Sequence, residues 1–225
     1  MNIIHDLNLN YRIVISGTFV FIVILVGVFG PMLPVKDPLA MNISDRLTGP
    51  SSKFLLGTDE YGRDLFSRII YGARASLLVG ITSVIIASIG GVITGMLAAY
   101  FGGATEMLFM RLIEVLLSFP PILLAIIVVG FLGSSILNLI LVIGLLYIPY
   151  FGRITFGTVK SVMSKDYVEA TRSIGANSFF ILRKSILPNI LSPVIVQASL
   201  TMASAILLES GLSFLGLGVQ PPTPS

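Results

Sequence analysis

The sequence predicts an all-α integral membrane protein, and its composition is the first reason. Of its 225 residues, 55% are hydrophobic and only 11% are charged, and the mean hydropathy is +0.97. A soluble domain carries about 25% charged residues, so this chain has too little polar surface for a water-soluble globule. The second reason is that its apolar runs are continuous rather than alternating. This favours helices over a closed barrel, the other structure that satisfies the backbone in lipid.

The composition also excludes several kinds of active site. Cysteine is absent, which excludes disulfides, thiol catalysis and cysteine-ligated zinc or iron–sulfur sites. A single histidine, His5, excludes a histidine-cluster metal site and argues against a Ser/His/Asp triad. We therefore expect no catalytic, cofactor-binding or metal-binding residues. The net charge of +3 fits cationic loops on one side of a membrane better than a nucleic-acid surface.

Five stretches are apolar enough to span a bilayer, which takes about 20 residues per helix. None of them contains Lys or Arg, and they cover residues 13–30, 76–100, 115–132, 136–152 and 191–208. The chain then divides into an N-terminal segment, a first span, a loop with an interfacial helix, a transmembrane core and a final segment. These cover residues 1–12, 13–30, 31–75, 76–208 and 209–225.

The charges of the loops predict the orientation of the chain. Loop 153–190 carries six basic and two acidic residues, whereas loop 133–135 and the segment after Glu209 carry no basic residue. Short cationic loops stay in the cytoplasm, so we place loop 153–190 and the N-terminus inside and loop 31–75 outside. The chain ends outside, after an odd number of spans and a proline-rich stretch, which leads us to expect that a sixth helix is missing.

Loop 31–75 contains a helix signal before the second span. Thr58 is a plausible N-cap, and Asp59 and Glu60 would then lie in the first turn. The apolar residues that follow fall on one helix face, which predicts an amphipathic helix at the membrane interface.

A stripe of small residues runs along the second span at intervals of four. Residues spaced in this way share a helix face, and membrane helices use small residues for close backbone approach. We expect the stripe to be a helix-packing surface, with a substrate-lining role as the alternative; its members are Ala87, Gly91, Gly95 and Ala99.

The third span carries Pro120 and Pro121, which predict a kink or a restart of the helix. Glu114 stands near one end of this span, where Arg111 at i−3 can pair with it. Glu209 ends the fifth span, where we expect it to face head groups or an aqueous cavity, although a buried carboxylate would be a functional candidate.

Loop 153–190 contains two cap-and-stop patterns. Asp166 and Glu169 predict a capping box that opens a short helix, and Gly175 is placed to end it in a left-handed conformation. Asn177 or Ser178 can then cap a second short helix over 179–187, which Pro188 would interrupt. The two helices would form a rigid elbow outside the membrane.

The residues of this loop resemble a motif of a known protein family. The order Glu169-Ala170-Thr171, Gly175 and Leu187-Pro188 resembles the EAA loop of ABC-importer permeases, with Thr171 at the second alanine and Ser185 at the usual isoleucine. A signature in loop 31–75 and the segment 211–218 are similar to the C-type permease of the dipeptide/oligopeptide/nickel branch. The signature residues are Gly57, Thr58, Asp59, Gly62, Arg63, Asp64, Ser67 and Arg68.

The resemblance implies a helical bundle of the MetI-like type I importer fold, with five spans of an expected six. It implies a multi-pass permease in the bacterial or archaeal inner membrane that forms the pathway with a second, homologous permease. Two cytoplasmic ATPase subunits would bind ATP and Mg²⁺ and contact the loop 166–188, with Asp166, Tyr167, Glu169, Ala170, Thr171, Gly175, Leu187 and Pro188 as coupling residues. An extracytoplasmic binding protein would deliver a peptide, a nickel chelate or glutathione.

ATP handling by this chain itself is not expected. The spacing from Gly152 to Gly157 matches a phosphate-binding loop, but Thr158-Val159 follows in place of Lys-Ser/Thr. The main alternative is an ion-coupled secondary transporter or channel, which would normally need ionisable groups or broken helices near the midplane. An intramembrane hydrolase is the third class.

Overall fold

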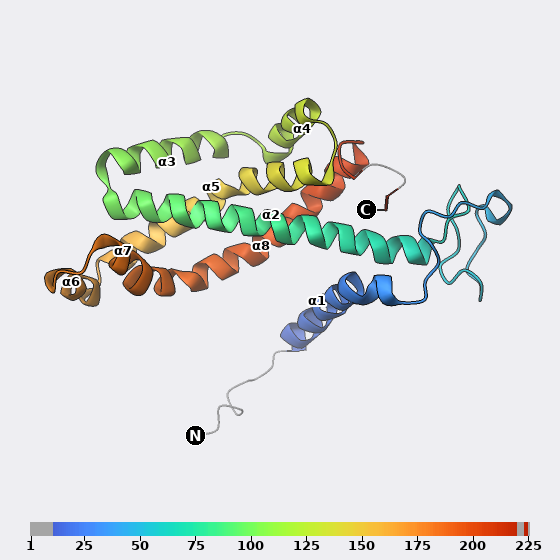
Figure 1. The fold of residues 1–225 in the computed structure, drawn as a ribbon, viewed down its shortest axis with the longest axis horizontal. Coiled ribbons are helices and arrows are strands. Elements are labelled where there is room, and N and C mark those ends of the chain that lie inside the picture. The colour runs from blue at the N-terminus through green and yellow to red at the C-terminus, as the bar shows by residue number, and fades with distance from the viewer. Residues whose placement is uncertain (1–10, 220–222, 225) are drawn as a thin grey trace, which may run out of the picture. The chain divides into compact units, whose positions relative to one another are not determined.

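The computed structural model describes residues 11–219 and 223–224, and it is mostly helical, with an extended loop before α2 (Figure 1). Within those residues the only β-pairing is an isolated bridge between Thr58 and Asp64, so the predicted all-α fold is confirmed. The helices are α1 (Tyr11–Phe29), α2 (Leu65–Phe101), α3 (Gly103–Leu117), α4 (Pro121–Leu132), α5 (Ile136–Met163), α6 (Asp166–Ser173), α7 (Ser178–Phe180) and α8 (Leu187–Phe214). Short 3-10 turns cover Gly30–Met32 and Ile43–Asp45, and a π-helix covers Ile181–Ile186.

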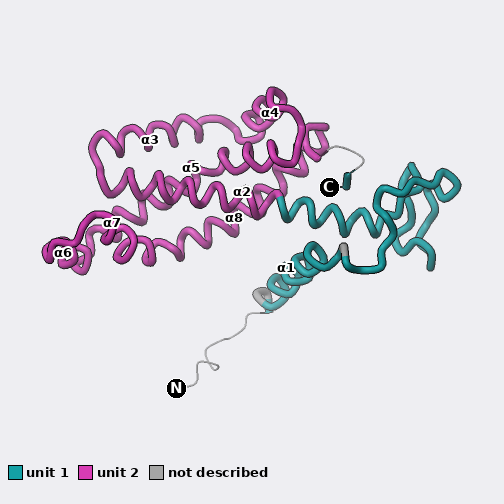
Figure 2. Tube along the Cα trace, viewed as in Figure 1, with its two compact units in different colours: residues 1–78, 221–225 teal, residues 79–220 magenta. Residues whose placement is uncertain are grey.

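The chain forms two compact units (Figure 2). Unit 1 consists of residues 1–78 and 221–225, and unit 2 of residues 79–220. The boundary falls within α2, which gives its first turns to unit 1 and the remainder to unit 2. The N-terminal segment 1–12 predicted to be cytoplasmic lies almost entirely outside the described residues.

Three helices in the described part of the chain are long and apolar enough to cross a membrane. They cover Leu65–Phe101, Ile136–Met163 and Ser178–Phe214, and the bent pair α3 and α4 would make a fourth span if it counts as one. α1 provides a shorter apolar helix over Val14–Phe29. Four of the five apolar stretches therefore each lie largely in one helix, the stretch 115–132 is divided between α3 and α4, and three helices extend well beyond the apolar stretch that predicted them.

The restart predicted at Pro120 and Pro121 is confirmed, and the stretch 115–132 therefore lies in two helices. α3 ends at Leu117, α4 begins at Pro121, and the two helices meet at an angle of 90°. Pro121 has no N–H to continue the hydrogen-bond ladder, and Pro120 disfavours the helical conformation at Phe119. The two prolines together thus break the helix instead of kinking it, and Pro121 opens the next one.

The interruption predicted at Pro188 does not occur either. The helix continues from Ser178 through the π-helix into α8, and Pro188 lies in the first turn of α8. The wider π turn precedes the proline, and the Asn189 side chain donates to the carbonyl oxygen of Ser185 at 2.8 Å. A π-helical turn pairs residues five apart, so the ladder is rearranged around the proline without ending.

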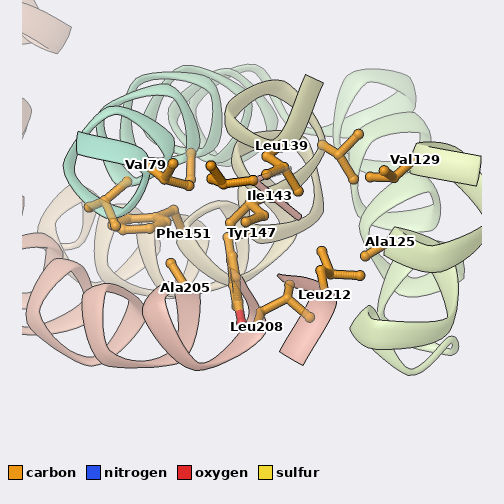
Figure 3. Packing of buried hydrophobic residues seen from close by; sticks show 14 of the residues in the cluster. Val79, Ala125, Val129, Leu139, Ile143, Tyr147, Phe151, Ala205, Leu208 and Leu212 are labelled. Atoms are coloured by element: carbon orange, nitrogen blue, oxygen red, sulfur yellow. The ribbon is translucent and has the colours of Figure 1, made fainter. Parts of the chain in front are cut away.

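α5 is the central helix of unit 2, because it packs against α3, α4 and α8. Figure 3 shows the main core, in which Leu139, Ile143 and Phe151 of α5 meet Ala205 and Leu212 of α8. All five side chains are fully buried. Because Gly144 has no side chain, the α5 backbone can lie close to Ile86 of α2.

The backbones of α2 and α5 approach each other closely in unit 2. A Cβ atom added at Gly91 would lie 2.3 Å from the Phe151 Cβ and 2.7 Å from the Ile148 carbonyl oxygen. One added at Gly95 would lie 2.5 Å from the carbonyl oxygen of Gly152. Ala87 and Ala99 on the same face are fully buried. The small-residue stripe thus lies where two backbones touch, an arrangement that only glycine permits at positions 91 and 95.

Gly95→Leu should destabilise the helix bundle strongly, since its side chain would have to displace α5 backbone atoms rather than a flexible side chain. Overpacking costs on the order of 3 kcal/mol, so we expect a lower yield of folded protein in detergent and a lower melting temperature. Gly157→Leu is the matched control, because nothing lies within 4 Å of a Cβ at that position. Equal melting temperatures for the two variants would show that α2 and α5 do not pack as described.

Candidate functional site

The first candidate site is the elbow formed by α6, Gly175, α7 and the π-helix, residues 166–187. α6 begins at Asp166, and its N-cap is Lys165, which makes no capping hydrogen bond with its side chain. The predicted capping box is therefore wrong, because the helix starts one residue early and Asp166 is already in its first turn. Asp166 and Glu169 instead place two carboxylates near the helix N-terminus, where the dipole favours negative charge.

Gly175 ends α6 in a left-handed conformation, with φ of +82°, as the sequence predicted. The Gly175 N–H donates to the Arg172 carbonyl at 3.0 Å, and the Ala176 N–H donates to the Thr171 carbonyl at 3.3 Å. This pair of bonds is a Schellman motif, which closes a helix and turns the chain sharply. Residue 175 therefore fixes the angle of the elbow, and nothing lies within 4 Å of the position of its absent Cβ.

Asn177 caps the second half of the elbow. Its side-chain oxygen accepts a hydrogen bond from the Phe180 N–H at 2.8 Å, which confirms one of the two caps that the sequence offered. The Thr171 hydroxyl donates to the Tyr167 carbonyl at 2.7 Å within α6. The two helical segments are thus each closed by local hydrogen bonds at the bend.

Buried apolar residues attach the elbow to the bundle. Val168 of α6 and Ile181 and Ile186 of the π-helix are at most 1% exposed, and they pack with Ala99 of α2 and Val159 of α5. This cluster, completed by Val162 and Ile190, lies at the end of the bundle where Figure 1 shows α6 and α7. The elbow is therefore a rigid extension of α2, α5 and α8 rather than a solvated loop.

The elbow also carries exposed apolar side chains. Ile174 is 83% exposed, Phe179 is 69% exposed, and Tyr167 and Phe180 are also exposed. Asp166, Glu169, Ala170 and Gly175 are exposed as well, and Thr171 and Leu187 are partly buried. The sequence motif did not identify Ile174 and Phe179 as surface residues. Their exposure could have been predicted, because they are large apolar residues beside two helix caps in a segment expected to lie outside the membrane. Such a surface is suited to a protein partner.

The second candidate site is the polar turn that holds the signature residues of loop 31–75 in unit 1. Asp59 lies at its centre: its carboxylate accepts hydrogen bonds from the N–H groups of Tyr61 at 2.8 Å and Arg63 at 3.0 Å. The Arg63 guanidinium donates to the same carboxylate at 2.7 Å, and the Arg68 guanidinium lies 3.8 Å away. Three of the signature residues, Asp59, Arg63 and Arg68, therefore form one network.

Backbone contacts fix the rest of this turn. Gly62 has φ of +73°, and a Cβ there would lie 1.8 Å from the Asn42 carbonyl oxygen. Gly57, at φ of +81°, is similarly close to the Thr48 carbonyl oxygen. The Thr58 hydroxyl accepts from the Thr48 N–H at 2.9 Å. The sequence motif did not indicate that segment 42–48 would be the partner of the signature.

Thr58 is not a helix N-cap, and the helix predicted to lead into the second span is the first part of α2. The helix begins at Leu65 and continues without a break as α2. Asp64 performs the capping, since its carboxylate accepts from the Ser67 N–H at 3.0 Å and its carbonyl accepts from the Arg68 N–H at 3.1 Å. The prediction that Asp59 lies in the first turn of a helix is wrong, because its carboxylate binds Arg63 and does not face a helix N-terminus.

The two acidic residues noted near the spans behave differently. Arg111 pairs with Glu114 at 3.0 Å as predicted, on an exposed face of α3. Glu209 is only 1% exposed, and its carboxylate accepts a hydrogen bond from the Ser213 hydroxyl at 2.9 Å. The expected position facing head groups or a cavity is wrong, because α8 extends to Phe214 and Glu209 is not at its end.

The environment of Asp59 makes unit 1 sensitive to acid. Burial raises the pKa of its carboxyl, but the hydrogen bonds from Arg63 and Tyr61 outweigh burial, so the pKa is lowered from its ordinary value. Removing one partner from a fully buried ion pair costs about 3 kcal/mol, and solvent screening reduces this cost for the partly buried Asp59–Arg63 pair. Asp59→Asn should therefore lower the melting temperature of the protein at neutral pH.

This stabilisation has a defined pH window. A carboxyl whose pKa is lower in the folded state stabilises the folded protein at any pH above the unfolded-state pKa. This contribution is lost as the pH falls through the folded-state pKa. The difference in melting temperature between wild type and Asp59→Asn should be constant near neutrality and shrink on acidification. Exposed Glu60 provides the control Glu60→Gln. A difference that does not change with pH would contradict the assigned ion pair.

Sequence comparison identifies close relatives of this chain. It is 42% identical over 212 residues to the di/tripeptide transport system permease protein DppC of Pseudomonas aeruginosa, covering 92% of this chain and 70% of that protein. It is 43% identical to the dipeptide permease DppC of Alkalihalophilus pseudofirmus, covering 89% and 66%. It is 41% identical to the glutathione permease GsiD of Pectobacterium atrosepticum, covering 94% and 70%. The chain thus spans about two thirds of the length of these relatives.

The fold has a solved counterpart as well. A chain of the MetNI methionine ABC transporter, solved in inward-facing conformations, superimposes with a TM-score of 0.61 at 18% identity, covering 68% of this chain and 76% of that chain. This likeness confirms the expected MetI-like permease fold. Residues 91–225 match the family of binding-protein-dependent transport system inner membrane components. With that match and the relatives above, the chain belongs to this family, and it is a non-enzymatic membrane permease component of a binding-protein-dependent importer.

Proposed function

We propose that this permease couples ATP hydrolysis on partner subunits to import through the elbow, residues 166–187. The observation that carries the proposal is that one face of the elbow is fully buried against α2 and α5 while Ile174 and Tyr167 are exposed. A partner that binds the exposed face can displace the elbow, and the buried cluster would transmit the displacement to the spanning helices. ATP and Mg²⁺ would be bound by that partner and not by this chain.

Family membership implies further subunits. We infer a second, homologous permease, two cytoplasmic ATPase subunits and an extracytoplasmic binding protein. The substrate that we propose is a small peptide, since the relatives described above are named for dipeptides, tripeptides and glutathione, which is itself a tripeptide. The residues that line the pathway would be shared with the second permease.

The proposed orientation places the elbow in the cytoplasm and the Asp59 turn outside. Because the chain has no cysteine, Ser52→Cys and Ser161→Cys each introduce a single thiol, and both positions are exposed. We expect an impermeant thiol reagent to label Ser52→Cys in intact cells and Ser161→Cys only after permeabilisation. Labelling of Ser161→Cys in intact cells would reverse the topology.

Gly175→Val should uncouple the transporter without unfolding the spans. A β-branched residue at a left-handed position costs about 1–2 kcal/mol, so the Schellman turn would open and the angle of the elbow would change. Gly175→Asn is the matched control, because asparagine tolerates this conformation. In liposomes that contain the assembled transporter, we expect Gly175→Val to reduce substrate-stimulated ATP hydrolysis and ATPase co-purification, and Gly175→Asn to retain both. Wild-type values for Gly175→Val would contradict the coupling role.

Glu169→Lys tests the exposed carboxylate of α6 separately from the bend. It puts a cation in the first turn of a helix, which costs only about 0.3–1 kcal/mol, so the elbow should stay folded. We expect weaker co-purification with the ATPase subunits than for Glu169→Gln, which removes the charge without reversing it. Equal attachment of the two variants would mean that Glu169 does not face the partner.

A further inference from the structure

One side of α2 carries a stripe of exposed isoleucines within unit 2. Ile81, Ile85, Ile89 and Ile93 recur every four residues, and each is about half exposed, between 47% and 56%. Ile89 and Gly91 are two residues apart, or about 200° around the helix, so this stripe lies opposite the glycine contact with α5. We refer to these four residues as the isoleucine stripe, and its exposure in a membrane component indicates contact with acyl chains.

The isoleucine stripe leads into an apolar groove beside the elbow. The groove has a volume of about 380 Å³, and its floor and walls come from α2 and from the segment 179–187. All but one of its lining residues are apolar; they are Ile93, Met96, Leu97, Phe179, Leu182, Leu187 and Arg183. Ile93 belongs both to the stripe and to the groove, which makes the two surfaces continuous.

Arg183 provides the only charge on this groove. Arg183 and its neighbour Lys184 are exposed in the last turn of the π-helix. Neither belongs to any of the ion pairs formed within the described residues. An arginine presents several N–H donors in a planar fork that matches the oxygens of a phosphate. A long apolar path that ends at unneutralised cations is complementary to an amphiphile with an anionic head.

We propose that this groove binds an anionic phospholipid, with one acyl chain along Ile89 and Ile93 and the phosphate at Arg183. Continuity with the isoleucine stripe favours a bilayer lipid, because a soluble anion would leave the apolar walls unfilled. Basic sites beside membrane helices bind anionic lipid head groups in this manner. The bound lipid contacts both α2 and the π-helix, so it lies on the same structural element that the proposed function assigns to coupling.

The absence of tryptophan makes a direct test possible. Ile93→Trp introduces a single fluorophore in the groove, and Ile85→Trp introduces one on the isoleucine stripe but outside the groove. The whole chain is reconstituted in vesicles that contain dibrominated phosphatidylglycerol or dibrominated phosphatidylcholine, and quenching is measured. For Ile93→Trp we expect the anionic lipid to be preferred about fivefold, the factor that one basic residue contributes near an anionic lipid surface. For Ile85→Trp we expect equal quenching by the two lipids.

Removal of the head-group contact completes the test. Adding Arg183→Gln to Ile93→Trp should abolish the preference, whereas adding Lys160→Gln, a charge already paired with Glu106 at 2.8 Å, should leave it unchanged. Phe179→Trp serves as a second reporter should Ile93→Trp fold poorly, and excess inorganic phosphate should not displace the lipid. The proposal is overturned if both lipids quench equally at position 93, if Arg183→Gln has no effect, or if free phosphate competes. None of these outcomes depends on transport, so the proposed function can fail independently.

Discussion

The contact between the backbones of α2 and α5 is the constraint on which unit 2 depends. In lipid there is no hydrophobic force between helices, so van der Waals contact and interhelical hydrogen bonds must hold them together. Gly91 and Gly95 permit that contact, and the Ser83 hydroxyl adds a hydrogen bond to the Ile140 carbonyl at 3.1 Å. Because α3, α4 and α8 all pack on α5, displacing α5 from α2 would disturb the whole bundle.

The same helices carry the elbow. Ala99 continues the face of Gly91 and Gly95 by one more turn and ends in the cluster that holds Val168 and Ile181. A side chain larger than alanine at that end would separate the elbow from α2. Rigid attachment matters for a coupling element because a flexible loop would absorb a displacement without moving the spans. The exposed face can then vary with its partner while the buried face stays fixed.

The polar turn of unit 1 is held together by a different kind of interaction. Asp59 accepts both backbone and guanidinium hydrogen bonds, and Gly57 and Gly62 allow segment 42–48 to lie directly against it. The sequence indicates that the signature residues belong together, but their spacing alone predicted the start of a helix. A Thr-Asp-Glu sequence fits a helix N-terminus equally well, and only the partner across the turn distinguishes the two structures.

The sequence by itself determined the apolar helices, the small-residue face of α2, the left-handed turn at Gly175 and the cap at Asn177, because each depends on helix periodicity or on local backbone conformation. It also carried the family signature. The tertiary structure decided how the helices continue: the 90° angle between α3 and α4, the π-helical passage past Pro188, and the burial of Glu209. These features depend on which carbonyls and side chains lie nearby in space, and residues distant in the chain supply those neighbours.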